Sequence, residues 1–278
     1  MNQSIMDSIN KPSVVKRGDA ARAHWSILYL LLRGTFARVI VLIFATAAVQ
    51  VGLFYTVLQK ELEAAAAGVG AFAPPETLIF RSGAAPIAGV GLILLSILLC
   101  SFGSGRTAGL ALGRLRVEEK TIFWWQSLYN TLCYALLLVV QGVLMSALLL
   151  WYAKEAPAYA WSEQTLFLTF YRSGYLHGLL PLEEISRHLR NALLILSLGM
   201  CAAGYPYRRR KGHIPLNIVA MVAITLVGFC ASLGSLAGDI IVMMLCCANV
   251  VELVTYIYRK EDAENAESNE RVKRDIDA

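Results

Sequence analysis

The chain contains a series of long apolar stretches separated by shorter polar connections. A helix needs about 20 apolar residues to cross the hydrocarbon core of a bilayer. Composition agrees with such crossings, because 57% of the 278 residues are hydrophobic, only 16% are charged and the mean hydropathy is +0.56. We therefore expect an all-α fold, a polytopic transmembrane helical bundle of about six spans. The predicted spans are 36–58, 85–102, 123–152, 191–207, 214–233 and 237–258.

The polar ends of the chain set its domain organisation. Residues 1–18 are polar, and we interpret them as a disordered N-terminal segment. Residues 259–278 mix charges of both signs, and we interpret them as a solvated, charged tail. The remainder, 19–258, is expected to form a single transmembrane domain, because no stretch outside the apolar runs is long enough to bury its own core. A loop of small residues such as Ala64–Ala67 is expected after the first span.

The stretch 19–33 precedes the first span and has apolar residues on one helical face. A single helix from Trp25 to Leu58 would be about 50 Å long, which exceeds the apolar core of a bilayer. We therefore expect a break near Arg33 and Gly34, with 19–33 lying along the membrane surface as an interfacial amphipathic helix. The alternative is that this stretch simply extends the first span.

Lysine and arginine are distributed unevenly over the connections. Nineteen of the 25 lie before Val39, in 103–122, in 208–213 or in the tail, and six lie in the alternate connections. Basic connections stay in the cytoplasm under the positive-inside rule. Six spans return the chain to its starting side, so we expect both termini in the cytoplasm and the protein in the inner (plasma) membrane of a bacterium. The net charge of +5 then favours contact with anionic lipid headgroups and not with nucleic acid.

The sequence lacks motifs for enzymatic chemistry. The glycine-rich stretch from Gly103 to Gly113 lacks the Gly-Lys-Ser/Thr end of a nucleotide-binding loop, so we do not expect the chain to hydrolyse ATP itself. An intramembrane protease needs paired aspartates, or a serine with a histidine, inside the bilayer, whereas Asp239 stands alone at the edge of a span. The six cysteines fall within apolar runs without metal-ligand spacing. We expect no catalytic residues, no metal site and no cofactor.

We single out four polar side chains inside predicted spans, where polar groups are costly and therefore informative. We expect Gln50 and Gln141 to form hydrogen bonds between helices. The other two are Asn249 and Glu252, the only carboxylate well inside a span, about two turns before Arg259. We interpret Glu252 as the partner of a basic residue in a cytoplasmic loop. The alternative is that it lines a conduit or transmits movement from a partner protein.

The segment 112–123 is the most specific part of the chain, because it is short and basic and runs directly into the third span. Its mixture of charged and apolar side chains suits a docking surface. It resembles the membrane subunits of ABC exporters of the ABC-type-two class, which often carry an R-L-P-V-S-x-x-x-I-F stretch between spans two and three. Here that stretch reads Arg114, Leu115, Arg116, Val117, Glu118, Glu119, Lys120, Thr121, Ile122 and Phe123.

The resemblance implies a partner as well as a topology. In that family the stretch forms a coupling helix on which a separate ATP-binding subunit docks, and 19–33 would correspond to an elbow helix before the first span. A second membrane subunit, identical or related, would complete the pathway as a homodimer or heterodimer. Unlike the family, this chain has its long outer segment at 153–190, between spans three and four. The implied docking residues are Arg114, Leu115, Arg116, Glu118, Lys120, Ile122 and Phe123.

On this hypothesis the chain is a permease-like subunit of an ATP-driven export complex. Two other classes of function stay open. One is a non-transporting membrane accessory protein, for assembly or sensing. The other is a small channel or secondary carrier, a class that often shows internal repeats and polar sites at the midplane. We find no convincing repeat between 36–152 and 191–258.

Overall fold

The structure, a computed structural model, describes residues 25–26, 28–68, 72–104, 119–157, 160–181, 185–210, 216–230 and 236–277. These residues are helical apart from short turns and include no strand, so the predicted all-α fold class is confirmed. The helices are the π-helix η1 (Leu32–Phe36), α3 (Ala37–Ala66), α4 (Pro75–Arg81), α5 (Ala84–Ser104), α7 (Glu119–Glu155), α8 (Glu163–Arg172), α9 (Gly174–Leu179), α10 (Ile185–Arg210), α11 (Leu216–Cys230) and α12 (Leu236–Asp277).

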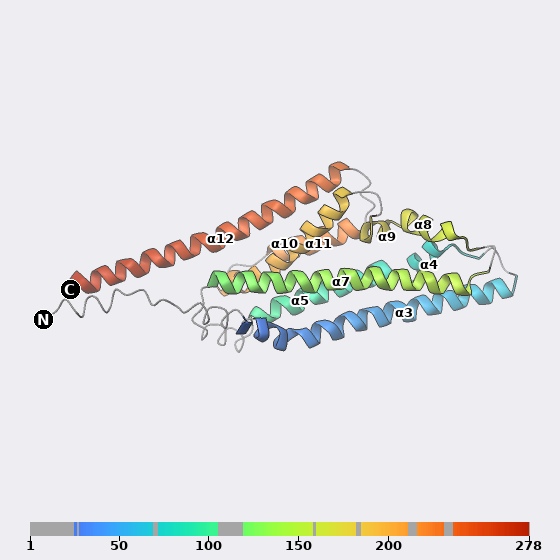
Figure 1. The fold of residues 1–278 in the computed structure, drawn as a ribbon, viewed down its shortest axis with the longest axis horizontal. Coiled ribbons are helices and arrows are strands. Elements are labelled where there is room, and N and C mark those ends of the chain that lie inside the picture. The colour runs from blue at the N-terminus through green and yellow to red at the C-terminus, as the bar shows by residue number, and fades with distance from the viewer. Residues whose placement is uncertain are drawn as a thin grey trace.

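The long helices form an elongated bundle in which consecutive helices run in opposite directions (Figure 1). Helices α3, α5 and α7 lie along one another, and α10 packs against α5 and α7. Helices α11 and α12 pack against α10 in turn. We call the end at which α7 begins and α10 ends the basic end, because Arg208, Arg209 and Arg210 finish α10 there. Helices α4, α8 and α9 lie toward the opposite end (Figure 1).

Among the described residues, four helices are long and apolar enough to cross a membrane: Leu28–Ala66, Ala84–Ser101, Lys120–Glu155 and Leu236–Arg259. This finding supports a membrane protein. Helix α11 contributes a shorter apolar helix, Leu216–Phe229. Helix α10 is less apolar, and its position gives a reason, because α5, α7, α11 and α12 all pack against it and protein forms much of its surroundings. The count of six spans stays a prediction.

Helix α10 is at the centre of the core. Its Leu194, Leu198 and Ala202 are almost completely buried. Gly199 lets α7 approach closely, because a Cβ atom there would lie 2.1 Å from the hydroxyl oxygen of Thr131. No side chain fits at that distance, so a residue without a Cβ is required where these two helices meet.

The predicted break before the first span is wrong for the part of the chain that the structure describes. The helix is continuous over Leu28–Ala66, and Arg33 and Gly34 lie within the π-helical turn η1. Residues 28–33 therefore extend the first span, as in the alternative interpretation. Residues 19–24 and residue 27 of the predicted interfacial helix lie outside the described residues.

The side chain of Thr35 gives a physical reason for this continuity. Its hydroxyl donates a hydrogen bond to the carbonyl of Leu31 at 2.8 Å and lies 2.7 Å from the hydroxyl of Tyr129 on α7. The wider π turn accommodates a local irregularity without ending the helix. Contact with α7 then holds the turn in place.

Helix extends further than predicted at the end of α3, where we expected a loop, and at the end of α12, in the charged tail. Ala64–Ala66 form the last turn of α3, in keeping with the high helix propensity of alanine. Helix α12 runs for 42 residues to Asp277, about 63 Å, and so includes most of the predicted tail. Glu267 and Arg271 stand four residues apart in that tail, a spacing that favours helix.

Candidate functional site

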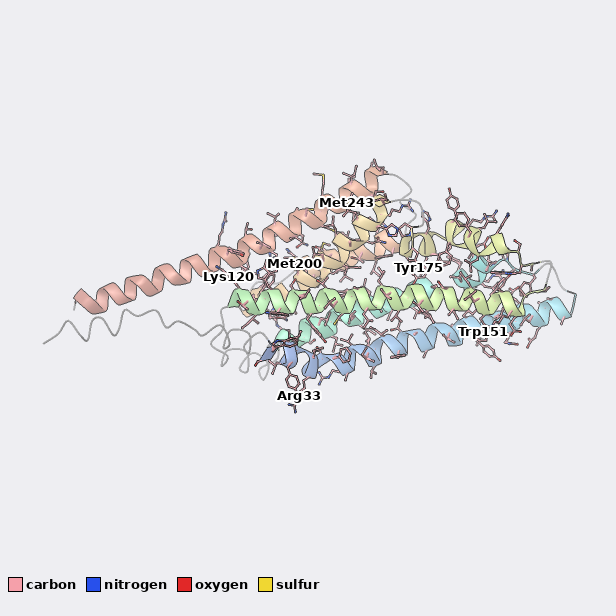
Figure 2. All side chains as sticks on the ribbon, in the orientation of Figure 1. Arg33, Lys120, Trp151, Tyr175, Met200 and Met243 are labelled. Atoms are coloured by element: carbon pink, nitrogen blue, oxygen red, sulfur yellow. The ribbon has the colours of Figure 1, made fainter. Side chains whose placement is uncertain are left out.

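The structure divides the predicted docking segment. Lys120, Ile122 and Phe123 belong to the first turns of α7, at the basic end of the bundle (Figure 2). The other four predicted docking residues lie outside the described residues: Arg114, Leu115, Arg116 and Glu118. The site can therefore be built only from the α7 side of the segment.

Phe123 packs the start of α7 against α10 and α12. It is 1% exposed, and its ring meets that of Tyr207 on α10 edge to face, with 6.2 Å between the ring centroids. Leu253 and Ile257 of α12 belong to the same cluster. We call this cluster the three-helix junction: Phe123, Met200, Ala203, Tyr207, Leu253 and Ile257. Apolar packing of this density leaves little freedom for one helix to move without the others.

Two neighbours of Phe123 add to this attachment. The ammonium nitrogen of Lys120 lies 4.6 Å from the centre of the Tyr258 ring on α12, within the range of a cation–π contact. Ile122 is buried in the adjoining core cluster, which also contains Tyr129. The first turn of α7 is thus held by apolar contacts on one side and by α12 on the other.

Glu252 joins α10, α11 and α12 at the basic end. It accepts a hydrogen bond from Arg208 at 2.9 Å and another from the side chain of Asn217 at 3.1 Å. The Arg208 guanidinium also lies 5.2 Å from the centre of the Tyr256 ring. The contact agrees with our interpretation of Glu252 as the partner of a basic residue, although Arg208 is still helical. The Glu252 side chain is 59% exposed, so this ion pair is not sealed inside the bundle.

The polar groups expected within spans all have interhelical contacts. The amide of Gln50 on α3 donates to the carbonyl of Ala84 on α5 at 2.9 Å. The hydroxyl of Tyr175 on α9 donates to the amide oxygen of Gln141 on α7 at 3.2 Å. The thiol of Cys201 on α10 donates to the amide oxygen of Asn249 on α12 at 3.3 Å. Each contact joins two helices, as membrane bundles commonly do with amides.

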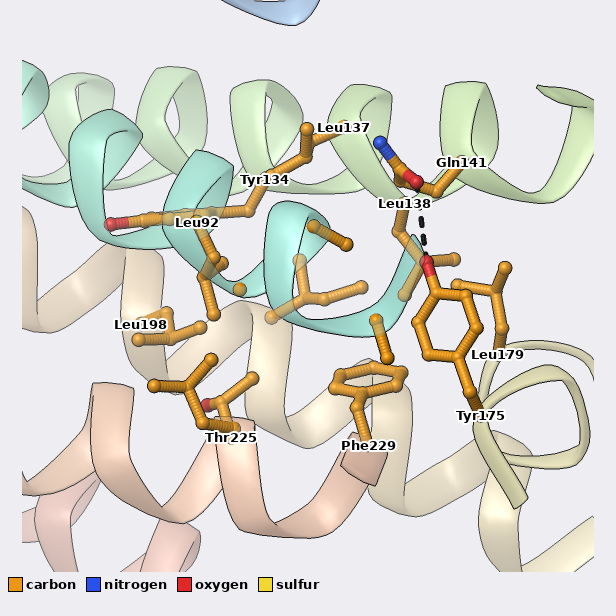
Figure 3. A pocket seen from close by; sticks show the side chains of 15 residues that line it. Leu92, Tyr134, Leu137, Leu138, Gln141, Tyr175, Leu179, Leu198, Thr225 and Phe229 are labelled. Carbon is orange, nitrogen blue, oxygen red and sulfur yellow. Dashed lines mark hydrogen bonds between the residues drawn. The ribbon is translucent and has the colours of Figure 1, made fainter. Parts of the chain in front are cut away.

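A small, partly open cavity of about 70 Å³ lies beside Gln141 and is lined by α5, α7, α9, α10 and α11 (Figure 3). Tyr175 points into it from α9 and reaches Gln141, and Phe229 of α11 also lines it. The hydroxyl groups of Tyr134 and Thr225 are used within the bundle, by hydrogen bonds to Ser96 and to the Met221 carbonyl. The lining is otherwise apolar and holds no acid or base. The cavity suits an apolar group and offers nothing for catalysis.

The structure also reveals a charged cluster that sequence reasoning did not assemble. Near the opposite end, Arg190 of α10 donates to Asp239 of α12 at 2.7 Å, and both side chains are at most 2% exposed. Arg187 lies 3.8 Å from the other oxygen of Asp239 and is 7% exposed. Asn191 accepts two bonds from Arg190 and donates to the carbonyl of Gly178 on α9. We call these four side chains, Arg187, Arg190, Asn191 and Asp239, the buried charge cluster.

Sequence spacing contained a signal for this cluster. Arg187 and Arg190 are three residues apart and so share a helical face. Asp239 stands near the start of the last apolar helix, at the same end of the bundle as the start of α10. The sequence alone could not show that these two spans are neighbours.

Within the described ranges, no group of three or more histidine, cysteine, aspartate or glutamate side chains could hold a metal ion. The cysteines described there are free: Cys100, Cys133, Cys201, Cys246 and Cys247. No family of known proteins, no curated protein and no solved structure matches this chain. The case for a function therefore depends on the geometry of the basic end.

Proposed function

We propose that this chain is the membrane subunit of an ATP-driven export complex, and that a separate ATP-binding subunit docks on 112–123. The observation that carries the proposal is the burial of Phe123 in the three-helix junction. Phe123 is the last residue of the docking segment, and it anchors the start of α7 on both α10 and α12. A displacement of 112–123 would therefore also move α10 and α12, because their side chains pack against Phe123.

The basic end also supplies contacts that can change during such a displacement. The exposed Glu252 pairs with Arg208 and Asn217 from two neighbouring helices. Glu252 lies about two turns before Arg259, so its carboxylate can reach toward the membrane surface and exchange Arg208 for water or a lipid headgroup at small cost. A bundle with one tightly packed junction and one exchangeable polar contact suits movement between two arrangements.

The proposal includes a membrane orientation. Six helices cross the inner membrane, with the basic end and both termini in the cytoplasm. The support is the excess of lysine and arginine in alternate connections. Because α3, α7 and α11 begin at the same end of the bundle, the alternation of helix directions agrees with this threading (Figure 1). The docking segment then faces the compartment that holds ATP.

Charge reversal tests the docking surface directly. We expect the variant Arg114→Glu, Arg116→Glu, Lys120→Glu to lose the ATP-binding subunit from the complex purified from native membranes, while inserting normally. The measurement is ATP hydrolysis by the purified complex, together with identification of the co-purified subunit by mass spectrometry.

A matched variant controls for the change in net charge. Lys60, Lys154 and Arg172 lie near the opposite end of the bundle, so their reversal to glutamate is expected to leave ATP hydrolysis and co-purification unchanged. Full retention of the ATP-binding subunit by the basic-end variant would rule out docking on 112–123. The hypotheses of an accessory protein and of a small channel or carrier would then replace the proposed export function.

A further inference from the structure

A groove runs between α5 and α11 in the basic half of the bundle. Its volume is about 530 Å³, and Tyr205 and Arg209 of α10 line one end of it. Its floor is buried within the protein, with Ser96 5%, Cys100 7% and Ile218 7% exposed. Its rim is open, with Ile97 57% and Val219 64% exposed. The groove is thus a depression between two helices with a closed floor and an open side.

The lining of the groove presents hydrocarbon to an occupant. The Ser96 hydroxyl donates to the Leu92 carbonyl at 2.8 Å and accepts from Tyr134 at 2.9 Å. The Ser101 hydroxyl donates to the Ile97 carbonyl at 2.6 Å. Both serines therefore use their hydroxyl groups within the bundle, and the remaining lining of α5 and α11 is apolar. An apolar occupant gains by contact with such a surface.

The depth of the groove corresponds to one leaflet. Its lining on α5 extends from Ile93 to Ser101, and eight residues of helix span about 12 Å. Half of the hydrocarbon core of a bilayer is about 15 Å. At the basic end the lining ends at Arg209, which is exposed and is followed in sequence by Arg210 and Lys211. An apolar groove one leaflet deep that ends at cationic side chains is complementary to an anionic phospholipid.

The inner end of the groove is closed by direct contact between its two helices. A Cβ atom at Gly89 of α5 would lie 2.9 Å from a methyl carbon of Leu226 on α11. Leu226 lines both the groove and the small interior cavity. The two spaces therefore meet at this contact, and the groove stops near the depth at which an acyl chain of one leaflet would end.

A second depression, between α3 and α5, provides a comparison. Its volume is about 630 Å³, and Arg38 lies in its lining, together with Val41 and Ala45. None of its lining residues is buried, so it is a shallow hollow without a floor. Lipid beside it would contact a surface on one side only, whereas the α5–α11 groove surrounds its occupant on several sides.

We propose that the α5–α11 groove binds one acyl chain of an anionic phospholipid from the leaflet at the basic end, with the phosphate at Arg209. The occupant is a bilayer lipid and is independent of any ATP-binding partner. The groove is thus a lipid-binding site in its own right, and the proposed export function does not have to hold for it to exist.

Native mass spectrometry of the full chain in mild detergent tests this proposal. The protein is titrated with phosphatidylglycerol or with phosphatidylcholine of the same acyl chains. We expect one phosphatidylglycerol to bind about fivefold more tightly than phosphatidylcholine, the preference that one cation near the membrane surface supplies. Arg209→Gln is expected to bring the two lipids to equal affinity. Ala223→Phe, at an exposed lining position of α11, is expected to remove the bound lipid by filling the groove.

Matched variants in the shallow hollow serve as controls. Arg38→Gln and Ala45→Phe make the same changes between α3 and α5, and both are expected to leave the bound phosphatidylglycerol in place. Equal binding of the two lipids by the unchanged protein would overturn the proposal, and so would retention of lipid by Ala223→Phe. If the variants in the groove and their controls in the shallow hollow lost the same amount of bound phosphatidylglycerol, the loss would reflect bulk exchange of lipid for detergent. That result would also overturn the proposal. The same spectra report oligomeric state, and a dimer that Ala223→Phe dissociates without lipid loss would assign the groove to a second copy instead.

Discussion

Helices α10 and α12 are joined by charged side chains at both ends, and the two contacts differ in burial. At the opposite end, Arg190 and Asp239 are 2% and 1% exposed and belong to a cluster with Arg187. At the basic end, Arg208 and Glu252 are 13% and 59% exposed. The donor–acceptor distances, 2.7 Å and 2.9 Å, are nearly the same. Distance alone therefore does not show what each pair does.

The difference in burial assigns different roles to the two ends. A buried charge that loses its partner is left without solvation, so the buried charge cluster resists opening. An exposed pair exchanges its partner for water or for a lipid headgroup at little cost. We infer that α10 and α12 stay fixed at the opposite end and can shift at the basic end, where the proposed docking segment leads into α7.

Removal of the negative charge from the buried charge cluster is expected to cause the largest loss of stability. Asp239→Asn leaves Arg187 and Arg190 buried beside an uncharged amide, and we expect it to lower the free energy of unfolding by about 3–5 kcal/mol. Thermal unfolding in detergent measures the effect. A loss below about 1 kcal/mol would mean that water or lipid reaches the cluster and that its burial has no structural role.

A smaller effect is expected where α10 meets α7. A methyl group at Gly199 would collide with the hydroxyl oxygen and backbone of Thr131, at 2.1 Å and 2.7 Å. We expect Gly199→Ala to cost about 1–3 kcal/mol, the usual range for an overpacked core. Gly228→Ala is the control, because its nearest contact would be 3.7 Å from Leu194. Similar unfolding temperatures for the two variants would show that α10 and α7 separate easily.

The exposed pair should give the smallest change in stability. Glu252→Gln keeps the side-chain shape and removes the charge opposite Arg208, and we expect the free energy of unfolding to change by less than about 1 kcal/mol. ATP hydrolysis by the purified complex is expected to change more than stability does, because this contact lies beside the three-helix junction. A stability loss as large as that of Asp239→Asn would mean that the two ion pairs stabilise the bundle equally. It would contradict the different roles that we infer for the two ends.

The sequence predicted much of the fold because helices that cross lipid need long apolar runs, which are easily recognised in a sequence. Long apolar runs located α3, α5, α7 and α12, and alternate basic connections predicted a common end for α7 and α10. The break predicted at the start of the first span was wrong for a local reason, because the side chain of Thr35 bridges to α7 and keeps the helix continuous. The sequence analysis also did not predict that α12 continues as a helix through most of the charged tail, although Glu267 and Arg271 have the spacing of a helix. Neither effect appears in a hydropathy pattern.

The site was less predictable than the fold. The sequence singled out Phe123 and Glu252 separately, yet their common location at the basic end depends on which helices are neighbours. The buried charge cluster was missed for the same reason, since Arg190 and Asp239 are 49 residues apart. The groove between α5 and α11 depends on packing alone, because nothing in either helix indicates a gap between them.

Distance measurements at the two ends test the central claim most directly. Spin labels would replace Arg209 of α10 and Thr255 of α12 at the basic end, and Ile185 of α10 and Leu236 of α12 at the opposite end, in the complex with the proposed ATP-binding subunit. Pulsed electron paramagnetic resonance would compare the nucleotide-free and ATP-bound states. We expect the basic-end distance to change while the opposite-end distance stays constant. Equal changes at both ends, or a fixed basic-end distance, would contradict the account.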